Sequence, residues 1–277
     1  MRLEGLGARR LAALASLAAA ACGPSVGSWT AAGPLATARA SHTASPLPTG
    51  GVLVAGGTDV NGNALASAEW YDPARRRWSA ASPLATAREA HSATLLPSGS
   101  VLACGGTGGV PSALASCELY DPAKGSWSAS APLATARYAA TATLLQTGKV
   151  AAVGGLDGSG NGIAAVELFD PASGAAGGGW AGTGDLGTDR GYHSAALLPS
   201  GKLLVLGGYN CDGDACGSLD SAEIYDPASG SWDGAGSVGD ARYDAAAALL
   251  PSGELLVAGG FGTGPGNPLQ SAAIYAE

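Results

Sequence analysis

The chain has 277 residues, including 45 glycines and 16 prolines, and is 46% hydrophobic and 13% charged. This hydrophobic content excludes a disordered chain, and one methionine with two phenylalanines excludes a helical core rich in those residues. The formal net charge of −8 is a poor match for nucleic-acid phosphates. Composition therefore favours a glycine-punctuated all-β protein that does not bind nucleic acid.

Residues 1–22 are predicted to be an export signal, and residues 23–277 a single domain. A basic segment precedes the apolar stretch 11–21, which is too short to span a bilayer and has the length of a signal-peptide core. Residues 19–22, Ala-Ala-Ala-Cys, resemble a bacterial lipobox, although the usual leucine is displaced to Leu17. Cys22 is therefore the candidate lipid-attachment residue, and ordinary signal cleavage is the alternative. The expected location is outside the cytoplasm: lipid-anchored in the cell envelope through Cys22, or periplasmic or extracellular.

The cysteine pattern agrees with export. Without Cys22 four cysteines remain, an even number that suits an oxidising compartment. Cys211 and Cys216 lie in one loop, whereas Cys104 and Cys117 fall on strands expected to be neighbours. The sequence therefore predicts two disulfides, one within each pair.

Five tandem repeats organise the chain. Each begins with a tryptophan, spaced 49 to 53 residues from the next, and has an arginine 10 residues and a Gly-Gly pair 27 residues after it. The tryptophans are Trp29, Trp78, Trp127, Trp180 and Trp232, and the arginines are Arg39, Arg88, Arg137, Arg190 and Arg242. In four copies Glu-x-aromatic-Asp-Pro follows the glycines. A period near 50 lies in the range of β-propeller repeats.

Each repeat is predicted to form four short strands. In the second copy these are residues 91–96, 101–106 and 116–120 and the segment around Trp127, separated by turn residues. Apolar runs such as 52–55 suit strands that are buried on both faces, as in blades stacked around an axis.

The apolar residues before each glycine pair, followed by a tyrosine and a tryptophan with six residues between them, resemble the kelch repeat. Three copies fit this spacing: Tyr71 with Trp78, Tyr120 with Trp127 and Tyr225 with Trp232. The copy with Phe169 and Trp180 carries a four-residue insertion. The resemblance covers residues 29–277 and implies a kelch-type β-propeller, an architecture also found in the central domain of galactose oxidase.

The ends of the repeat array predict how the propeller closes. The array begins with a lone fourth-strand element at Trp29 and stops after a third strand that ends at Tyr275. The Trp29 strand is expected to complete the last blade, so that five four-stranded blades form a closed ring without free sheet edges. A truncated product is the alternative, and an open ring would contradict closure.

Strand alternation assigns the loops to two ends of the blades. The loops that lead into each first strand and those after Gly-Gly share one end, here called the Gly-Gly end; the Pro-Ser-Gly and Asp-Pro turns share the other, the turn end. An insertion at 209–218, with Asp212 and Asp214, makes the Gly-Gly end the candidate ligand face.

The five repeat arginines have two interpretations. They could grip an acidic ligand near the axis, which makes them ligand-face candidates, or they could pair with the repeat glutamates inside the blades. Regular recurrence favours the structural interpretation, because a ligand rarely needs every copy.

Asp/Asn-rich loops and histidines are the two candidate kinds of metal ligand in the sequence. Loops 59–63, 157–161 and 210–214 place oxygen ligands at alternate positions but lack the glutamate of a calcium loop, so turn chemistry is favoured. His42, His91 and His193 occupy one slot of different repeats and are interpreted as packing residues. No metal or cofactor is expected.

Tyr192-His193 resembles the Tyr-His copper-ligand stretch of galactose oxidase. Only these two residues match, no other repeat has tyrosine in that slot, and the remaining histidine ligand of that family comes from a further domain. A copper-radical oxidase is therefore not expected, and both residues are kept as ligand-face candidates.

No nucleophile elbow, phosphate loop or zinc spacing is present in the sequence. The expected function is that of a non-catalytic, monomeric kelch-repeat protein that recognises a glycan or protein ligand through its face loops. The alternative is a carbohydrate-active enzyme, either mutarotase-like, as some kelch propellers are, or resembling the copper oxidase.

Overall fold

The computed structural model describes residues 30–109, 112–174, 177–212, 215–263 and 267–277. The chain divides into two units, Met1–Ala32 and Gly33–Glu277, and every strand of the described residues lies in the second. Among the residues described there is no helix long and apolar enough to cross a membrane.

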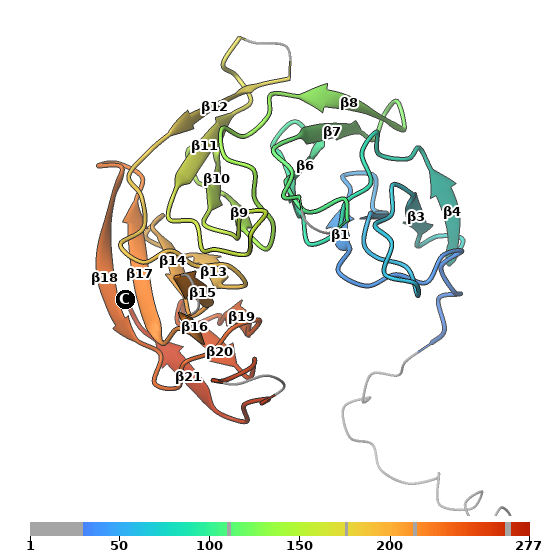
Figure 1. Cartoon of the computed structure of the whole chain (residues 1–277). Helices are drawn as coiled ribbons and strands as arrows, with labels where there is room; N and C mark the ends of the chain where they lie inside the picture. Colours follow the sequence, from blue (N-terminus) through green and yellow to red (C-terminus); the bar gives the residue numbers. More distant parts are fainter. Residues whose placement is uncertain (1–29, 110–111, 175–176, 213–214, 264–266) are drawn as a thin grey trace, which may run out of the picture. The chain divides into compact units, whose positions relative to one another are not determined.

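The second unit consists of five antiparallel blades and one hairpin (Figure 1). Blades one and two are β1 (Thr43–Pro46), β2 (Val52–Ala55), β3 (Ala68–Asp72) and β4 (Arg77–Ala81), then β5 (Ser92–Leu95), β6 (Val101–Cys104), β7 (Cys117–Asp121) and β8 (Ser126–Ser130). Blade three is β9 (Thr141–Leu144), β10 (Val150–Val153), β11 (Val166–Asp170) and β12 (Gly179–Gly182). Blade four is β13 (Ser194–Leu197), β14 (Leu203–Leu206), β17 (Ser221–Asp226) and β18 (Ser231–Ser237), and blade five is β19 (Ala246–Leu249), β20 (Leu255–Ala258) and β21 (Ala272–Tyr275).

The second strands of blades two to four, β6, β10 and β14, are apolar throughout because both of their faces are covered. In β6, Val101 and Ala103 pack against blade one, whereas Leu102 and Cys104 pack against blade three. All four side chains of β10 are buried in the same way. The first strands β1, β5, β9, β13 and β19 contact one another in that order. The predicted all-β propeller of five blades is confirmed.

The Gly-Gly pairs let neighbouring blades approach closely. Gly105 and Gly106 have φ of +67° and +91°, and a Cβ on Gly105 would lie 2.5 Å from the Arg137 carbonyl oxygen of the next blade. The Gly106 amide donates to that same oxygen at 2.9 Å. Only glycine combines this backbone conformation with this separation.

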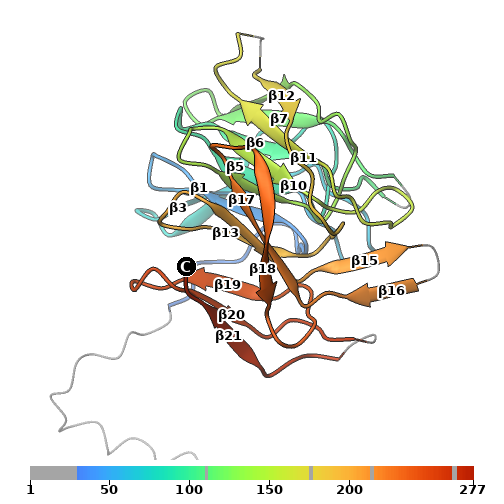
Figure 2. The same cartoon turned by 90° about the vertical axis from the view of Figure 1, so that its left-hand side faces the viewer.

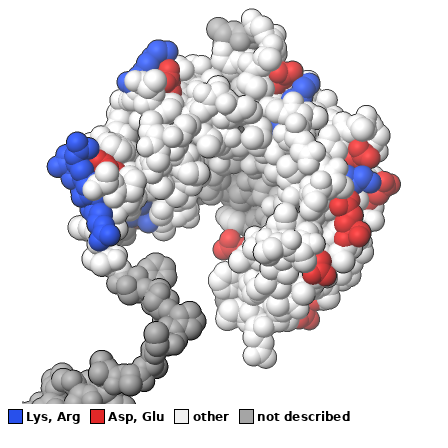
Figure 3. Space-filling model, turned by 180° about the vertical axis from the view of Figure 1, so that it is seen from behind, with Lys and Arg blue, Asp and Glu red and all other residues white. Residues whose placement is uncertain are grey.

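The closed ring is not found in the described residues. Blade five has three strands, and blades one and five do not meet (Figures 1 and 3). Ile274, on the outer face of blade five, is 59% exposed, and His42 of blade one is exposed although its counterparts are buried. The prediction that His42 is a packing residue is therefore wrong. The strand expected around Trp29 lies outside the described residues.

Insertion 209–218 forms a separate hairpin of β15 (Tyr209–Asp212) and β16 (Ala215–Ser218), which projects from the Gly-Gly end (Figure 2). Its disulfide joins Cys211 to Cys216, and a second disulfide joins Cys104 to Cys117 across β6 and β7. Both predicted pairings are confirmed. Cys22 lies outside the described residues.

Candidate ligand-binding site

The repeat arginines are buried inside the blades. The Arg88 guanidinium donates to Glu118 Oε1 at 2.9 Å and to the carbonyl oxygens of Gly105 and Ser116 at 2.7 and 3.0 Å. Glu118 also accepts the backbone amides of Ala85 and Thr86. Equivalent ion pairs are Arg39–Glu69, Arg137–Glu167 and Arg190–Glu223.

Burial leaves these guanidinium groups out of reach of a ligand, since their side chains are at most 1% exposed. Burial lowers the pKa of Arg88 and Arg137, and the paired glutamate opposes this shift by favouring the charged form. The assignment of Arg39, Arg88, Arg137, Arg190 and Arg242 as ligand-face residues is wrong, and the structural interpretation is correct.

Arg242 differs from the other four because Ala273 stands where its glutamate would be. It is 1% exposed and donates to the Gly259 and Ser271 carbonyls and to the Ser271 hydroxyl. No carboxylate among the described residues forms an ion pair with it. In the described part of the chain this guanidinium is held by hydrogen bonds alone.

His91 and His193 are buried between blades, as predicted for packing residues. Their Nε2 atoms lie 2.9 Å from Thr43 Oγ1 and 2.8 Å from Thr141 Oγ1 of the preceding blades. Burial, reinforced by the adjacent repeat arginine, lowers the pKa of each histidine to about 3. His193 is therefore a neutral interior group, whereas its neighbour Tyr192 is exposed.

Two of the Asp/Asn-rich loops are turns closed by their own aspartate. Asp59 Oδ1 accepts the amides of Asn61 and Asn63 at 2.8 and 2.9 Å, and Asp157 does the same in its loop. Within the described ranges no cluster of three potential ligands could hold a metal ion. Asp214 and the side chain of Asp212 lie outside what the structure describes.

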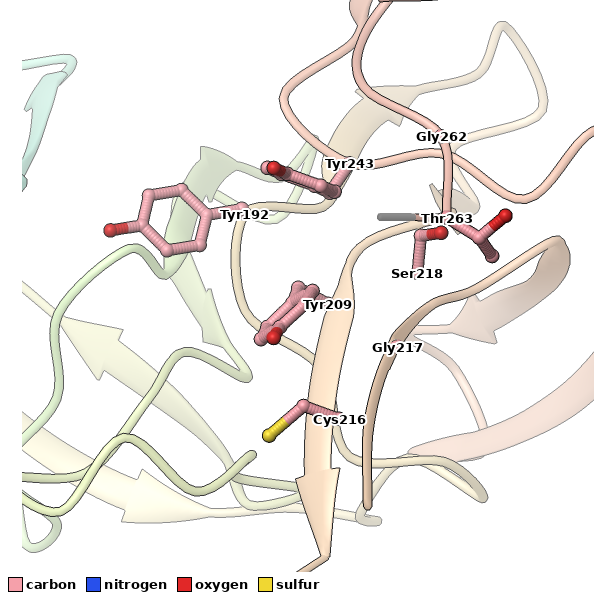
Figure 4. Close-up of a pocket in the computed structure, with 8 residues that line it drawn as sticks. All are labelled: Tyr192, Tyr209, Cys216, Gly217, Ser218, Tyr243, Gly262 and Thr263. Atoms are coloured by element: carbon pink, nitrogen blue, oxygen red, sulfur yellow. The ribbon is translucent and has the colours of Figure 1, made fainter. Parts of the chain in front are cut away.

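A cluster of aromatic side chains marks the Gly-Gly end of blades three to five. Tyr192, Tyr209 and Tyr243 surround one cavity (Figure 4). The ring centroids of Tyr243 lie 6.4 Å from Tyr192 and 5.4 Å from Tyr209, both edge-on. Tyr138 extends the cluster from Tyr192, with centroids 6.4 Å apart, and Phe261 stacks on Tyr243.

Three repeat positions supply these aromatic residues. The residue after the repeat arginine bridges to the residue after Gly-Gly, as in Tyr243↔Phe261 and Gly191↔Tyr209. The second residue after the arginine has φ near +50° in every blade and belongs to a backbone hydrogen-bond chain that connects successive blades. In blade four this position is Tyr192, whose amide donates to the Ala139 carbonyl at 2.9 Å. The propeller backbone thus places the tyrosines around the axis.

The cavity has a volume of about 580 Å³. Besides the three tyrosines, it is lined by the disulfide-bonded Cys216 and by Gly217, Ser218, Gly262 and Thr263. We call it the tyrosine pocket. A second cavity of about 410 Å³ lies on the other side of Tyr192 and is lined by Glu89, Ser41, Ser159 and Tyr138, among others. Tyr192 lines both cavities and is 38% exposed.

The charged groups near the tyrosines are carboxylates. Burial raises the pKa of Tyr192, and the neighbouring Asp244 and Glu89 add to the shift. Burial and Asp157 raise the pKa of Tyr138. Both phenols therefore keep their protons at neutral pH and can donate hydrogen bonds.

Sequence reasoning identified Tyr192 but missed Tyr138, Tyr209, Tyr243 and Phe261. The available signal was departure from the repeat: the same positions hold small or polar residues in blades one and two, such as Ala40 and Thr58. Comparing repeats for what differs, instead of what recurs, would have found the cluster.

The sequence pattern of the Kelch motif matches residues 40–85 and 190–238. The solved structure of YjhT superimposes with a TM-score of 0.71 at 14% identity, covering 86% of this chain and 84% of that chain. No curated protein matches the chain. The chain is a five-bladed β-propeller that carries the Kelch motif over these two segments. At this identity the solved structure shows the fold alone, which fits a binding or interaction role without naming the ligand.

Proposed function

We propose that the protein is an exported glycan-binding protein whose ligand stacks on the tyrosine pocket. The observation that carries this proposal is the grouping of Tyr192, Tyr209 and Tyr243 around one cavity of about 580 Å³. Tyrosine rings offer flat apolar faces with a hydroxyl at the edge, a combination that suits the apolar faces and hydroxyl groups of sugar rings.

The lining favours binding over catalysis. The residues around the tyrosine pocket are tyrosines, glycines, one serine, one threonine and a disulfide-bonded cysteine. None of them pairs a nucleophile with a histidine or carboxylate base, the arrangement that acid–base or covalent catalysis uses. The buried His193 is turned into the blade interface and does not serve the pocket.

Export is supported by two independent features. Residues 1–22 have the pattern of a signal segment with Cys22 as a lipid-attachment candidate. Both disulfides join residues that lie opposite each other in antiparallel strands, which suits an oxidising compartment. We therefore propose a monomer outside the cytoplasm, lipid-anchored in the cell envelope or free.

The proposal is tested with immobilised neutral tetrasaccharides of several linkages and the variant Tyr192→Ala. Alanine stands in the same slot at Ala90 and Ala139 with φ of 49° and 52°, so this variant keeps the backbone conformation. We expect at least one tetrasaccharide to bind and Tyr192→Ala to weaken its affinity about tenfold, the effect of losing one aromatic contact.

The control is Val60→Ala, an exposed residue at the Gly-Gly end of blade one, which should bind like the parent chain. Binding that is unaffected by Tyr192→Ala, or absent for every glycan tested, would remove the proposal. Turnover of a reducing sugar would instead favour the enzymatic alternative.

A further inference from the structure

Exposed cations lie at only one end of the blades in the described residues. Outside the buried repeat arginines, every described lysine and arginine lies in, or directly next to, a turn at the turn end. These residues are Arg75, Arg76, Arg77, Lys124, Lys149 and Lys202. Figure 3, which views the molecule from behind, shows Lys and Arg at the outer rim together with Asp and Glu. The Gly-Gly end therefore presents no exposed cation among the described residues.

The Gly-Gly end carries carboxylates instead. Asp244 is exposed beside Tyr192, and Glu89 lines the second cavity with Tyr138 and Tyr192. Asp157 acts on Tyr138 from the adjoining loop. Arg242, which has no ion pair among the described residues, does not offset this charge at the surface, because its guanidinium points into blade five toward Ser271 and Gly259. A ligand at the axis thus meets negative charge on the surface and the faces of tyrosine rings.

The two cavities are arranged as neighbouring subsites. Tyr192 stands between them, because it lines both the tyrosine pocket and the Glu89 cavity. The first is walled by aromatic rings and the second by Glu89 with hydroxyl groups such as those of Ser41 and Ser159. A chain of sugars can therefore cross Tyr192 with one unit on each side.

We propose that the ligand is a glycan chain that bears protonated amino groups, that is, an amino sugar without N-acetylation. This inference rests on the proposed function and names its ligand class. An ammonium group gains from the π faces of the tyrosines and from Glu89, whereas a carboxylate or sulfate on the ligand would be repelled. The stacking sugar ring occupies the tyrosine pocket, and the amino group of the next unit lies near Glu89.

The test compares three probes at pH 6 and low salt: glucosamine tetramer, its fully N-acetylated form, and an oligogalacturonate of the same length. We expect the amino form to bind about tenfold more tightly than the acetylated form, and the uronate not to bind. Glu89→Gln should abolish most of this preference, and added salt should reduce it. Glu254→Gln, at the turn end, is the matched control and should leave the preference unchanged.

The outcomes separate the two proposals. Equal, Tyr192-dependent affinity for the amino and acetylated tetramers overturns the amino-sugar inference and leaves the glycan-binding function intact. Preference for the uronate overturns it as well. Absence of any Tyr192-dependent binding, here and with the neutral tetrasaccharides, removes the proposed function itself. A preference that survives Glu89→Gln contradicts the assignment of the amino group to the second cavity.

Discussion

The charged residues that recur from repeat to repeat are structural because their charges are satisfied within the blade. Each of four arginines meets one glutamate and two carbonyl oxygens, as Arg137 does with Glu167, Gly154 and Ala165. The glutamate in turn accepts two loop amides, which fixes the entry into the blade. Removing one partner of such a buried pair leaves a charge without compensation. Repetition of a residue therefore marks the fold, and departure from repetition marks the site.

Arg242 offers a direct test of this network. Ala273→Glu should restore the missing pair and raise the free energy of unfolding by about 1–2 kcal/mol, because a charged hydrogen bond replaces an uncompensated buried charge. Glu167→Ala should lower it by about 3–5 kcal/mol. Urea unfolding followed by tryptophan fluorescence measures both.

Ala273→Gln is the matched control, since it has the shape of glutamate without its charge. A glutamine variant as stable as the glutamate variant would show that packing, not charge, accounts for the gain. A glutamate variant less stable than the parent would show that the side chain does not reach Arg242.

The two buried histidines predict a pH dependence of stability. Their pKa of about 3 in the folded protein lies below the unfolded value near 6.5, so acid protonates the unfolded chain first. The stability that they contribute is complete above pH 6.5 and is lost as the pH falls toward 3. At pH 5 the expected loss is about 2 kcal/mol for each histidine.

The measurement is the urea midpoint between pH 7 and pH 4. The double variant His91→Ala, His193→Ala should lose most of the slope that falls between pH 6.5 and 5, above the range in which carboxylates titrate. Alanine occupies this slot at Ala140 and Ala245, so the substitution follows the repeat. An unchanged slope in that range would contradict the assignment to these histidines.

At the scale of elements, the free edge of blade five is the feature that the described residues leave incomplete. In blades two to four a tryptophan of the outer strand packs on the aromatic residue of the third strand, with ring centroids 5.1 Å apart. Its indole N–H donates to a backbone carbonyl in the loop that leads into the same blade. In blade five a cavity of about 50 Å³ lies beside Tyr275, lined by Ala235 and Val238 of blade four. This is the place that such a tryptophan would occupy.

We expect Trp29 to fill this cavity and its strand to pair with β21. Residues 27–29, Gly-Ser-Trp, repeat the sequence that enters the outer strand at 125–127 and 230–232. Trp29→Ala should therefore increase amide hydrogen exchange of residues 270–277, because β21 would lose its partner. Val26→Ala, in the same segment, is the control and should leave exchange unchanged.

Only three residues lie between Trp29 and Gly33, so filling the cavity within one copy requires blade five to approach blade one. A second copy could supply the strand without that movement. Native mass spectrometry separates the two cases, since a Trp29-dependent dimer contradicts closure within one chain. Exchange that is the same in Trp29→Ala and the parent would contradict both.

At the scale of the whole molecule, the chemistry of the surface side chains differs between blades and between the two ends of the propeller. Blades one and two carry small or polar residues at the axis, whereas blades three to five carry the aromatic cluster. The exposed basic residues among those described lie at the turn end, together with acidic residues (Figure 3), whereas the tyrosines lie at the Gly-Gly end. The same backbone therefore presents two chemically different faces.

The sequence by itself determined the strands, the blades and both disulfides, because these follow from local periodicity and from residues that recur at fixed spacing. The positions of Trp127, Gly105 and Arg88 recur in every repeat because each has the same structural role in successive blades. The sequence also favoured the structural role of the arginines, although it could not show their burial.

Only the tertiary structure decided where function lies. Tyr138, Tyr192, Tyr209 and Tyr243 are scattered over 106 positions of the chain and meet because successive blades bring the same loop positions around one axis. It also separated blade one from blade five in the described residues, because closure depends on how far each blade rotates from the last. That rotation is set by the packing between blades, which the spacing of the repeats does not encode.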